Sequence, residues 1–376
     1  MNGLTVLKAM NGIDERFVAE AVPEKEKGKL LVLAKAAAVV AACVCLVAGG
    51  VYAYKSFQNS QLPLLEFEKI DFGGMGFEGS DSLTLEHSDD ISPWNEQIKI
   101  DKLPVYKNLL YRYEGQEKSY FSEEDLLKVA QEYSELLGEE IISYEKFTDD
   151  FNERIVRNVI AQTQNHQISV GGDGGVSIVF KNPEGLTDLS AVKAKYPFLF
   201  DENDVTGKYQ EFSIDGEPLG SYYKKYEKGE TVEQSVVNYT LNDMNFYYSE
   251  NGEIYFVSIN AQQRFSEKLG DYPVISFDEA KEKLLDGQYV SSVDEVSYIS
   301  SGRVEERLIR KVDIIYYTGN NQQLFMPYYR FYIWLDLRPF VTTGLPEDYE
   351  DYGYFYVPAV PEEYFVNYKL FDGSFQ

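Results

Sequence analysis

The sequence ISVGGDGGVSIVF, residues 168–180, decides the fold class of the central part of this chain. Runs of alternating apolar and β-branched or small polar residues flank the glycine-rich stretch 171–175. This alternation predicts two β-strands with one buried face each, and the glycines predict a tight turn between them. Glycine-rich loops also cradle phosphates, but such loops lead into a helix, whereas β-branched residues follow here. We therefore interpret the segment as an antiparallel β-hairpin.

Further strands are predicted on the C-terminal side of this hairpin. Asn251-Gly252, a pair that favours hairpin turns, separates two apolar-rich segments. Alternating patterns with one apolar face recur later in the chain, as in sheets that bury one side. The predicted strands cover residues 235–241, 244–248, 253–259, 312–317, 328–337 and 354–360.

Two helices are predicted from capping signals at their N-termini. Ser122 opens the segment SEEDLL and Ser276 opens SFDEAK, and both have an acidic residue three positions later, as in a capping box. Apolar residues at helical spacing follow each serine, and Gly138 and Gly287 mark the ends. A third helix is predicted over residues 146–160, where apolar residues recur on one helical face.

A helix followed by antiparallel strands thus occurs twice, which predicts an α+β fold. We expect an ectodomain of two related helix-plus-antiparallel-sheet lobes, one over residues 101–269 and the other over residues 270–376. Residues 55–100 contain the run GGMG and a polar tract without a sustained period. They are predicted to form a linker and an irregular lead-in to the first lobe.

Residues 36–54, AAAVVAACVCLVAGGVYAY, are long and apolar enough to form a transmembrane helix. At about 1.5 Å per residue the run covers roughly 28 Å, close to the roughly 30 Å of a bilayer core. Only Lys55 follows the run directly, whereas several lysines precede it, which predicts a cytoplasmic N-terminus and an extracellular C-terminal domain. The preceding lysines are Lys25, Lys27, Lys29 and Lys35.

Two processing signals share features with this apolar run. A cleaved signal peptide has the same polarity, although a charged region of about 35 residues is long for one. The residues VAAC, which end at Cys43, have the shape of a bacterial lipobox, although uncharged residues continue after the cysteine. An uncleaved single span is the favoured interpretation, and both alternatives stay open.

The charge of the chain restricts its partners. The chain has 35 Lys and Arg residues against 62 Asp and Glu residues, a formal net charge of -27. Residues 1–55 carry seven basic and five acidic side chains, so the remaining residues carry a net charge of -29. Such an acidic ectodomain repels nucleic acid and anionic lipid headgroups, which argues against both as partners.

The cysteine content fits the predicted topology. Cys43 and Cys45 are the only cysteines and lie inside the apolar run, so the predicted ectodomain forms no disulfide. About 320 residues bury an ordinary core without one, and 31 Tyr and 23 Phe residues provide bulky filling. This composition is typical of a Gram-positive bacterial cell surface protein.

The residues before the span, 1–35, are predicted to form a cytoplasmic leader of two short helices. Leu4, Leu7 and Met10 recur at helical spacing, and Phe17 and Val18 belong to a second apolar stripe. Such a short hairpin cannot bury a core of its own, so its apolar stripes are expected to dock on a cytoplasmic partner or on the inner membrane surface. Leu7, Phe17 and Val18 are the candidate partner-binding residues.

Two segments resemble known membrane proteins. The sequence GIDERFVAEA, residues 12–21, followed by lysines and the span, resembles the N-terminal leader of anti-sigma-like single-span membrane proteins of gut Clostridia. Residues 1–35 contain no His or Cys, so the resemblance does not extend to zinc-bearing anti-sigma domains.

The second resemblance lies in the C-terminal region. The order ISFDEAKEKLLDG (275–287), VDIIYY (312–317), PYYRFYIWL (327–335) and YVPAV (356–360) is similar to YycH/YycI-type regulators and to PepSY-like helix-plus-sheet units. Members of that type have one span and a cytoplasmic N-terminus, and they modulate a cell-wall sensor kinase. The resemblance implies a role in signalling through contacts with other proteins.

The sequence contains no familiar catalytic or metal-binding motif. His87 and His166 have no ligand residues at metal spacing and are interpreted as surface or structural residues. Acidic clusters at 201–204 and 347–351 could hold calcium or hydrolyse glycosides in principle, but neither has EF-hand spacing. Serine hydrolysis with a lysine base leaves little trace in sequence and stays open. We expect no catalytic residue, no cofactor and no metal site.

The sequence therefore favours a non-enzymatic, membrane-anchored extracytoplasmic regulatory or sensory protein that acts through protein or ligand binding. The alternative is a purely extracellular glycan- or peptide-binding module with a membrane anchor. Aromatic runs such as Tyr222-Tyr223 and Tyr328-Tyr329 could line a groove for such a ligand. Alternating strand positions favour core and cross-strand packing for them instead.

Overall fold

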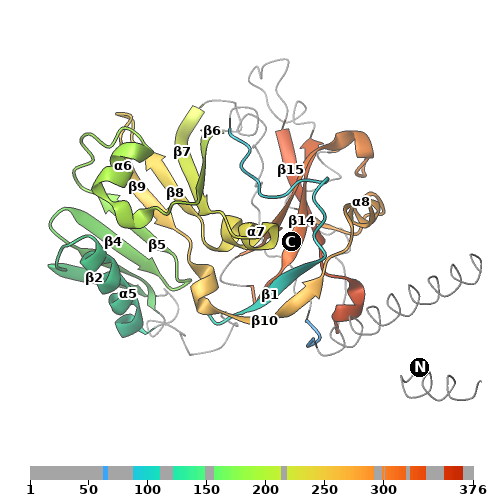
Figure 1. The fold of residues 1–376 in the computed structure, drawn as a ribbon, viewed down its shortest axis with the longest axis horizontal. Coiled ribbons are helices and arrows are strands. Elements are labelled where there is room, and N and C mark those ends of the chain that lie inside the picture. Colours follow the sequence, from blue (N-terminus) through green and yellow to red (C-terminus); the bar gives the residue numbers. More distant parts are fainter. Residues whose placement is uncertain are drawn as a thin grey trace, which may run out of the picture. The chain divides into compact units, whose positions relative to one another are not determined.

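The computed structural model describes residues 62–66, 88–110, 122–148, 156–212, 218–291, 299, 301–318, 322–335 and 351–366 (Figure 1). The chain divides into two compact units, Met1–Gln61 and Leu62–Gln376, and all described residues belong to the second. The apolar run 36–54 and the leader with Leu7, Phe17 and Val18 lie outside the described residues. Within the described ranges no helix is long and apolar enough to cross a bilayer.

The larger part of the second unit is built on an eight-stranded sheet in which every neighbouring pair is antiparallel. The strands follow one another in the order β2 (Ser143–Thr148), β3 (Val156–Gln162), β4 (His166–Gly171), β5 (Val176–Phe180), β9 (Ile254–Ile259), β8 (Met244–Tyr248), β7 (Pro218–Glu227) and β6 (Asp204–Phe212).

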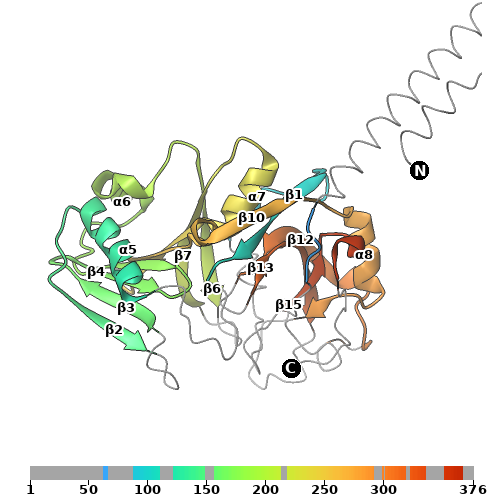
Figure 2. The ribbon, with the colours of Figure 1, turned by 90° about the horizontal axis from the view of Figure 1, so that it is seen from below.

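Helices cover one face of this sheet. α5 (Glu123–Leu136) packs against β3 and β4, and α6 (Leu189–Lys195) leads into the short η1 (Pro197–Leu199), as Figure 2 shows from below. Alternate strand residues point into the core between these layers and exclude water. They include Val159, Ile168, Ile178 and Val257, which are fully buried. Their burial is the main stabilising contribution of this part of the fold.

A second, four-stranded antiparallel sheet is rich in buried aromatic residues, among them Tyr329, Phe331 and Phe355. Its strands are ordered β11 (Val290–Ser291), β15 (Asp351–Pro358), β14 (Pro327–Leu335) and β12 (Ile309–Tyr316). α8 (Phe277–Leu285) packs on β15, and α7 (Val232–Leu241) contacts both β7 and β12. α7 therefore joins the two sheets, as Figure 1 shows at its centre.

A third sheet joins distant parts of the sequence. β1 (Lys102–Asn108) pairs on one side with β10 (Ser266–Pro273) and on the other with β13 (Leu324–Phe325). The lobe boundary expected between residues 269 and 270 falls inside β10. Short helical turns η2 (Gln262–Phe265), η3 (Glu306–Leu308) and η4 (Glu362–Tyr364) complete the described elements.

The two edges of the eight-stranded sheet differ. Residues 88–91, the described part of the predicted lead-in that lies along β6, are called the lead-in segment below. The backbone N–H of Asp89 donates to the carbonyl of Lys208 at 2.9 Å. The N–H of Lys208 donates to Asp89 Oδ2 at 2.8 Å. Gly207 allows this approach, because a Cβ there would lie 2.7 Å from Cγ2 of Ile91. The β6 edge is thus covered, whereas β2 at the opposite edge pairs only with β3 within the described ranges.

Most of the predicted elements are confirmed, and the fold is α+β. β4 and β5 form the predicted hairpin, and β8, β9, β12, β14 and β15 lie where strands were expected. Ser122 makes both halves of the capping box, and the Ser276 side chain accepts from the backbone N–H of Glu279. Gly138 and Gly287 follow the two helices with positive φ angles of 71° and 80°.

Two predictions are wrong. Residues 146–160 do not form a helix: 143–148 and 156–162 are strands β2 and β3, while 149–155 lie outside the described residues. Residues 235–241 belong to helix α7 instead of a strand. For α7, tertiary packing overrides the local pattern, because the helix buries apolar side chains on two sides and so lacks a simple helical stripe. For residues 156–162, pairing with β2 and β4 on both sides fixes an extended strand.

Candidate functional site

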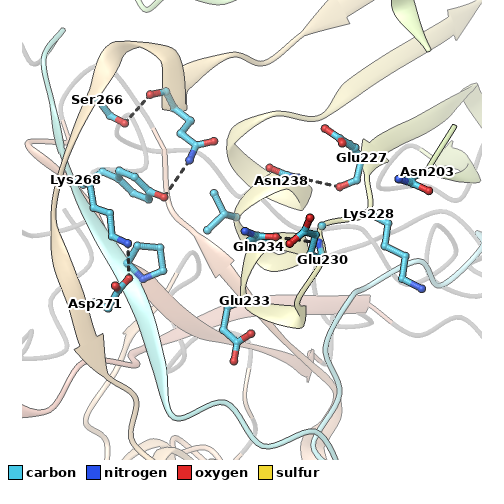
Figure 3. Close-up of a pocket in the computed structure, with 15 residues that line it drawn as sticks. Asn203, Glu227, Lys228, Glu230, Glu233, Gln234, Asn238, Ser266, Lys268 and Asp271 are labelled. Atoms are coloured by element: carbon cyan, nitrogen blue, oxygen red, sulfur yellow. Dashed lines mark hydrogen bonds and ion pairs between the residues drawn. The ribbon is translucent and has the colours of Figure 1, made fainter. Parts of the chain in front are cut away.

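An open cleft of about 1110 Å³ lies between α7 and the strands β1 and β10 (Figure 3). Its walls come from segments that are far apart in the sequence. The lining consists of Pro104, Tyr106, Asn203, Glu227, Lys228, Gly229, Glu230, Glu233, Gln234, Val237, Asn238, Gln263, Ser266, Lys268 and Asp271. The volume is slightly above the roughly 300–1,000 Å³ of pockets that hold small molecules.

The first turn of α7 and the loop before it form one wall. The side chain of Thr231 caps the helix by accepting from the N–H of Gln234 at 3.3 Å. The Gln234 side chain in turn accepts from the N–H of Glu230 at 2.9 Å, which holds the loop against the helix. Gly229 fits there because a Cβ would lie 2.3 Å from Cβ of Gln234. The loop is therefore fixed in a defined conformation.

Strands β1 and β10 form the opposite wall, with η2 beside them. Gln263 connects them: its side-chain Nε2 donates to the Tyr106 hydroxyl at 3.0 Å, and its carbonyl accepts from Ser266 Oγ at 2.9 Å. Lys268 Nζ lies 2.7 Å from Asp271 Oδ1. Burial raises the pKa of Tyr106, so its hydroxyl stays protonated at physiological pH. Figure 3 shows Ser266, Lys268 and Asp271 across the cleft from α7.

The cleft is polar and carries a net negative charge. Four carboxylates line it, from Glu227, Glu230, Glu233 and Asp271, against the two ammonium groups of Lys228 and Lys268. The lining also offers the amide groups of Asn203, Gln234 and Asn238. Such a surface attracts cationic groups and hydrogen-bond donors.

The described lining offers no nucleophile joined to a base. Its two side-chain hydroxyls belong to Tyr106 and Ser266, and Ser266 donates to a backbone carbonyl. In the described part of the chain no three His, Cys, Asp or Glu side chains converge as a metal would need.

Several of the residues that the sequence singled out lie outside the described part of the chain. Leu7, Phe17, Val18 and His87 lie outside the described residues, as do residues 347–350 of the second acidic cluster. In the first cluster the Asp204 carboxylate lies 2.7 Å from the buried ammonium of Lys225, so it stabilises the sheet.

His166 is buried in a hydrogen-bonded network at the start of β4. Its Nδ1 lies 3.0 Å from Glu139 Oε2, and its Nε2 lies 3.0 Å from the hydroxyl of Tyr196. Burial opposes ionisation of Glu139, but hydrogen bonds from Thr163, His166 and Asn165 outweigh it and lower the pKa of Glu139 to about 2. The network ties the chain after α5 to the turn between β3 and β4, which makes His166 a structural residue.

Aromatic side chains form a row across four neighbouring strands of the eight-stranded sheet. Tyr209, Tyr222, Tyr247 and Phe256 come from β6, β7, β8 and β9, with ring centroids 5.2 to 5.3 Å apart. All four are half-buried, on the face away from α5. The cross-strand packing expected for Tyr222 is confirmed.

The cleft was not predictable as a site from the sequence. Its acidic wall lies just before residues 235–241, which we expected to be a strand, and the other wall comes from β1 and β10, which are far apart in the chain. Gly229, two residues before the capping Thr231, is the one local sequence signal of the fixed loop at this cleft. No model of a known protein family matches this chain, and a comparison with curated proteins gives no match.

Proposed function

We propose that this protein is a non-enzymatic, membrane-anchored binding protein with a regulatory or sensory role outside the cytoplasm. In this proposal residues 36–54 anchor the chain as a transmembrane helix, and the two helix-plus-sheet lobes form the ectodomain. The observation that supports it most is the polar cleft between α7, β1 and β10. Its net negative charge and its amide groups suit a cationic ligand rich in hydrogen-bond donors, such as a basic peptide segment.

The place of the cleft in the fold suits a sensor. One wall is α7, which packs against β7 of one sheet and β12 of another, and the other wall belongs to the third sheet. A ligand that touches α7 and β10 together contacts the element that joins the two larger sheets. Binding can therefore favour one arrangement of the sheets over another, provided the ligand has different affinities for them.

The regulatory part of the proposal rests on the predicted cytoplasmic leader. Leu7, Phe17 and Val18 would contact a cytoplasmic partner, and the span would connect this contact to the ectodomain. Deleting residues 1–24 tests it in cells: a lost response with the protein still displayed at the surface supports regulation. An unchanged response would leave the leader as an anchor only.

Binding in the cleft is tested with the full chain in an uncharged detergent. A lysine-rich pentapeptide is titrated calorimetrically into the wild type and into the double variant Glu227→Lys, Glu230→Lys. We expect the affinity of the variant to fall by about tenfold or more, because two attractive charges become repulsive.

The matched control reverses two exposed carboxylates outside the cleft, Glu184→Lys and Glu250→Lys, and so has the same total charge. The control is expected to keep most of the affinity. Equal losses in both variants would show a non-specific effect of net charge and would refute the cleft as the binding site.

A second candidate function, glycan binding, is favoured by the aromatic row on the eight-stranded sheet. Half-buried Tyr222, Tyr247 and Phe256 lie beside a parallel row of polar residues, in which Ser258 pairs with Asn245 across β9 and β8. Aromatic faces flanked by hydroxyls and amides suit the apolar faces and hydroxyls of sugars. Binding of soluble cell-wall glycan fragments should then be lost in Tyr247→Ala and kept in Tyr255→Ala, whose side chain is exposed outside the row.

A further inference from the structure

We propose that the outer edge of β2, which pairs with no other described strand, is a docking site where an extended, basic segment of a partner protein adds to the eight-stranded sheet. The partner strand would pair with the backbone of β2 and place alternate side chains into the shallow groove between β2 and α5. This site is separate from the cleft between α7, β1 and β10 and does not depend on the function proposed for it.

The first observation is the exposure of β2. Five of its six residues are exposed and the sixth is half-buried, and β2 stands at the end of the sheet order. Figure 2 shows the strand at the outer margin of the sheet. An edge strand presents a row of unpaired N–H and C=O groups that can pair with another chain. Residues 88–91 cover the opposite edge of the sheet, at β6, whereas no described residues cover the outer edge of β2.

The second observation is that β2 lacks the devices that usually blunt an edge. It contains no proline, and its single lysine folds back onto α5, where Lys146 Nζ lies 2.8 Å from Glu123 Oε2. The Tyr144 hydroxyl donates to the other oxygen of Glu123 at 3.0 Å. Both side chains are thus held on the α5 side of the sheet, so no charged side chain of β2 guards its outer backbone edge except Glu145.

The third observation is a groove beside the edge. A shallow depression of about 440 Å³ lies between α5 and β2, lined by Glu124, Leu127, Lys128, Gln131, Ile141 and Tyr144. Apolar side chains remain exposed along the same edge, with Ile142 exposed by 71% and Phe147 by 44%. A strand between such a groove and a sheet edge gains affinity from its backbone pairing and specificity from alternate side chains.

The negative charge around β2 indicates which kind of segment can bind at its edge. Residues 122–148, which include α5 and β2, carry eight acidic and two basic side chains. A second copy of this chain paired through β2 would bring two strongly acidic surfaces together, and their repulsion opposes such a dimer. A segment in which lysine or arginine alternates with apolar residues has the complementary charge and the required pattern.

The test uses the full chain in an uncharged detergent and a fluorescent ten-residue peptide in which lysine alternates with valine or threonine. Its control has the same lysines but proline in place of each valine and threonine, which removes backbone pairing and keeps the charge. We expect the proline peptide to bind about tenfold more weakly or worse. Equal affinities of the two peptides would overturn the proposal, because the attraction would then be only electrostatic.

Hydrogen exchange locates the bound strand. Amides of residues 143–148 are expected to exchange more slowly when the alternating peptide is bound, while amides of β6 stay unchanged. Protection elsewhere with β2 unchanged would refute the site. Slower exchange of β2 without peptide, together with a dimer in sedimentation, would show that a second copy is the occupant and would also refute the proposal.

A charge variant separates this site from the cleft. Measured by the slowed exchange of residues 143–148, the affinity for the alternating peptide is expected to fall about tenfold in Glu124→Lys with Glu140→Lys. It is expected to stay within about twofold in the cleft variant Glu227→Lys, Glu230→Lys, which removes binding at the cleft alone. The reverse pattern would assign the peptide to the cleft and reject the β2 edge.

Discussion

Arg330 on β14 holds Asp313 on β12 in a two-point ion pair directly across the two strands. Nε of the guanidinium lies 2.9 Å from Oδ1 and Nη2 lies 2.5 Å from Oδ2. The carboxylate is fully buried and also accepts from the hydroxyl of Tyr332 at 3.2 Å. The guanidinium lies over the rings of Tyr332 and Tyr354, at 5.0 and 5.1 Å from their centroids. A charge in the core of the four-stranded sheet is thus fully compensated.

Removing the arginine should destabilise the protein strongly. Arg330→Met leaves the Asp313 carboxylate buried without its partner, so we expect the free energy of unfolding to fall by about 3–5 kcal/mol. Urea unfolding of the full chain in detergent, followed by tyrosine fluorescence, measures the change. The matched control is Arg264→Met, because Arg264 and Glu132 form an ion pair that is largely exposed and should contribute less than about 1 kcal/mol. Similar losses in both variants would contradict this account.

Because of the hydrogen-bonded network around His166, part of the free energy of unfolding depends on pH in the acid range. The pKa of Glu139 is about 2 in the folded protein, against an ordinary value of 4.5. Because folding lowers this pKa, the stabilisation is complete above pH 4.5 and is lost as the pH falls from there towards 2. Glu139→Gln should therefore be less stable than the wild type at pH 6, with a smaller difference at pH 3.

Urea unfolding curves of the wild type and of Glu139→Gln at pH 6 and pH 3 measure how much the stability difference between them changes with pH. Glu140→Gln changes an exposed carboxylate at the next position and serves as the control. A difference between Glu139→Gln and wild type that does not shrink on acidification would exclude the lowered pKa as the cause.

The close contact between the lead-in segment and β6 predicts that adding one methyl group at Gly207 destabilises the protein. Gly207→Ala places a Cβ against Ile91, so we expect a loss of about 1–3 kcal/mol from overpacking, with faster hydrogen exchange at Lys208 and Gln210. Gly220→Ala on the neighbouring strand adds a Cβ with no atom within 4 Å and should be close to neutral. Unchanged exchange along β6 in Gly207→Ala would refute the role of this contact.

The capping serines predict a graded series of variants. Ser122→Ala removes the acceptor for the first turn of α5 and should lower the free energy of unfolding by about 1 kcal/mol. Ser122→Thr restores a hydroxyl and should recover most of that loss. Equal stability of the alanine and threonine variants in urea would show that the cap is not used.

The sequence predicts best those elements whose signals are local. The serines before α5 and α8 and the glycine-rich turn between β4 and β5 act within a few residues, and the structure follows them. The segment 235–241 is different, because Val236, Val237 and Tyr239 resemble a strand in isolation. They form a helix because α7 is packed between β7 and β12, which gives it more than one buried side.

The side-chain pairs at the centre of the fold could not be predicted, since they depend on register. Glu139 meets His166 across 27 positions, and Arg330 faces Asp313 only because β12 and β14 pair with that alignment. A shift of one residue would turn the charges to the other face of the sheet. The cleft was missed for the same reason, because β1 and β10 come together only after folding.

The unequal edges of the eight-stranded sheet limit how copies of this protein can aggregate. Growth of a linear polymer by strand addition needs two free ends on every unit, one to accept and one to donate. Residues 88–91 already cover the β6 end through Asp89 and Lys208, which leaves β2 as the single uncovered end within the described part of this sheet. Among the described strands, addition to this sheet therefore ends after one step and does not continue into a linear polymer.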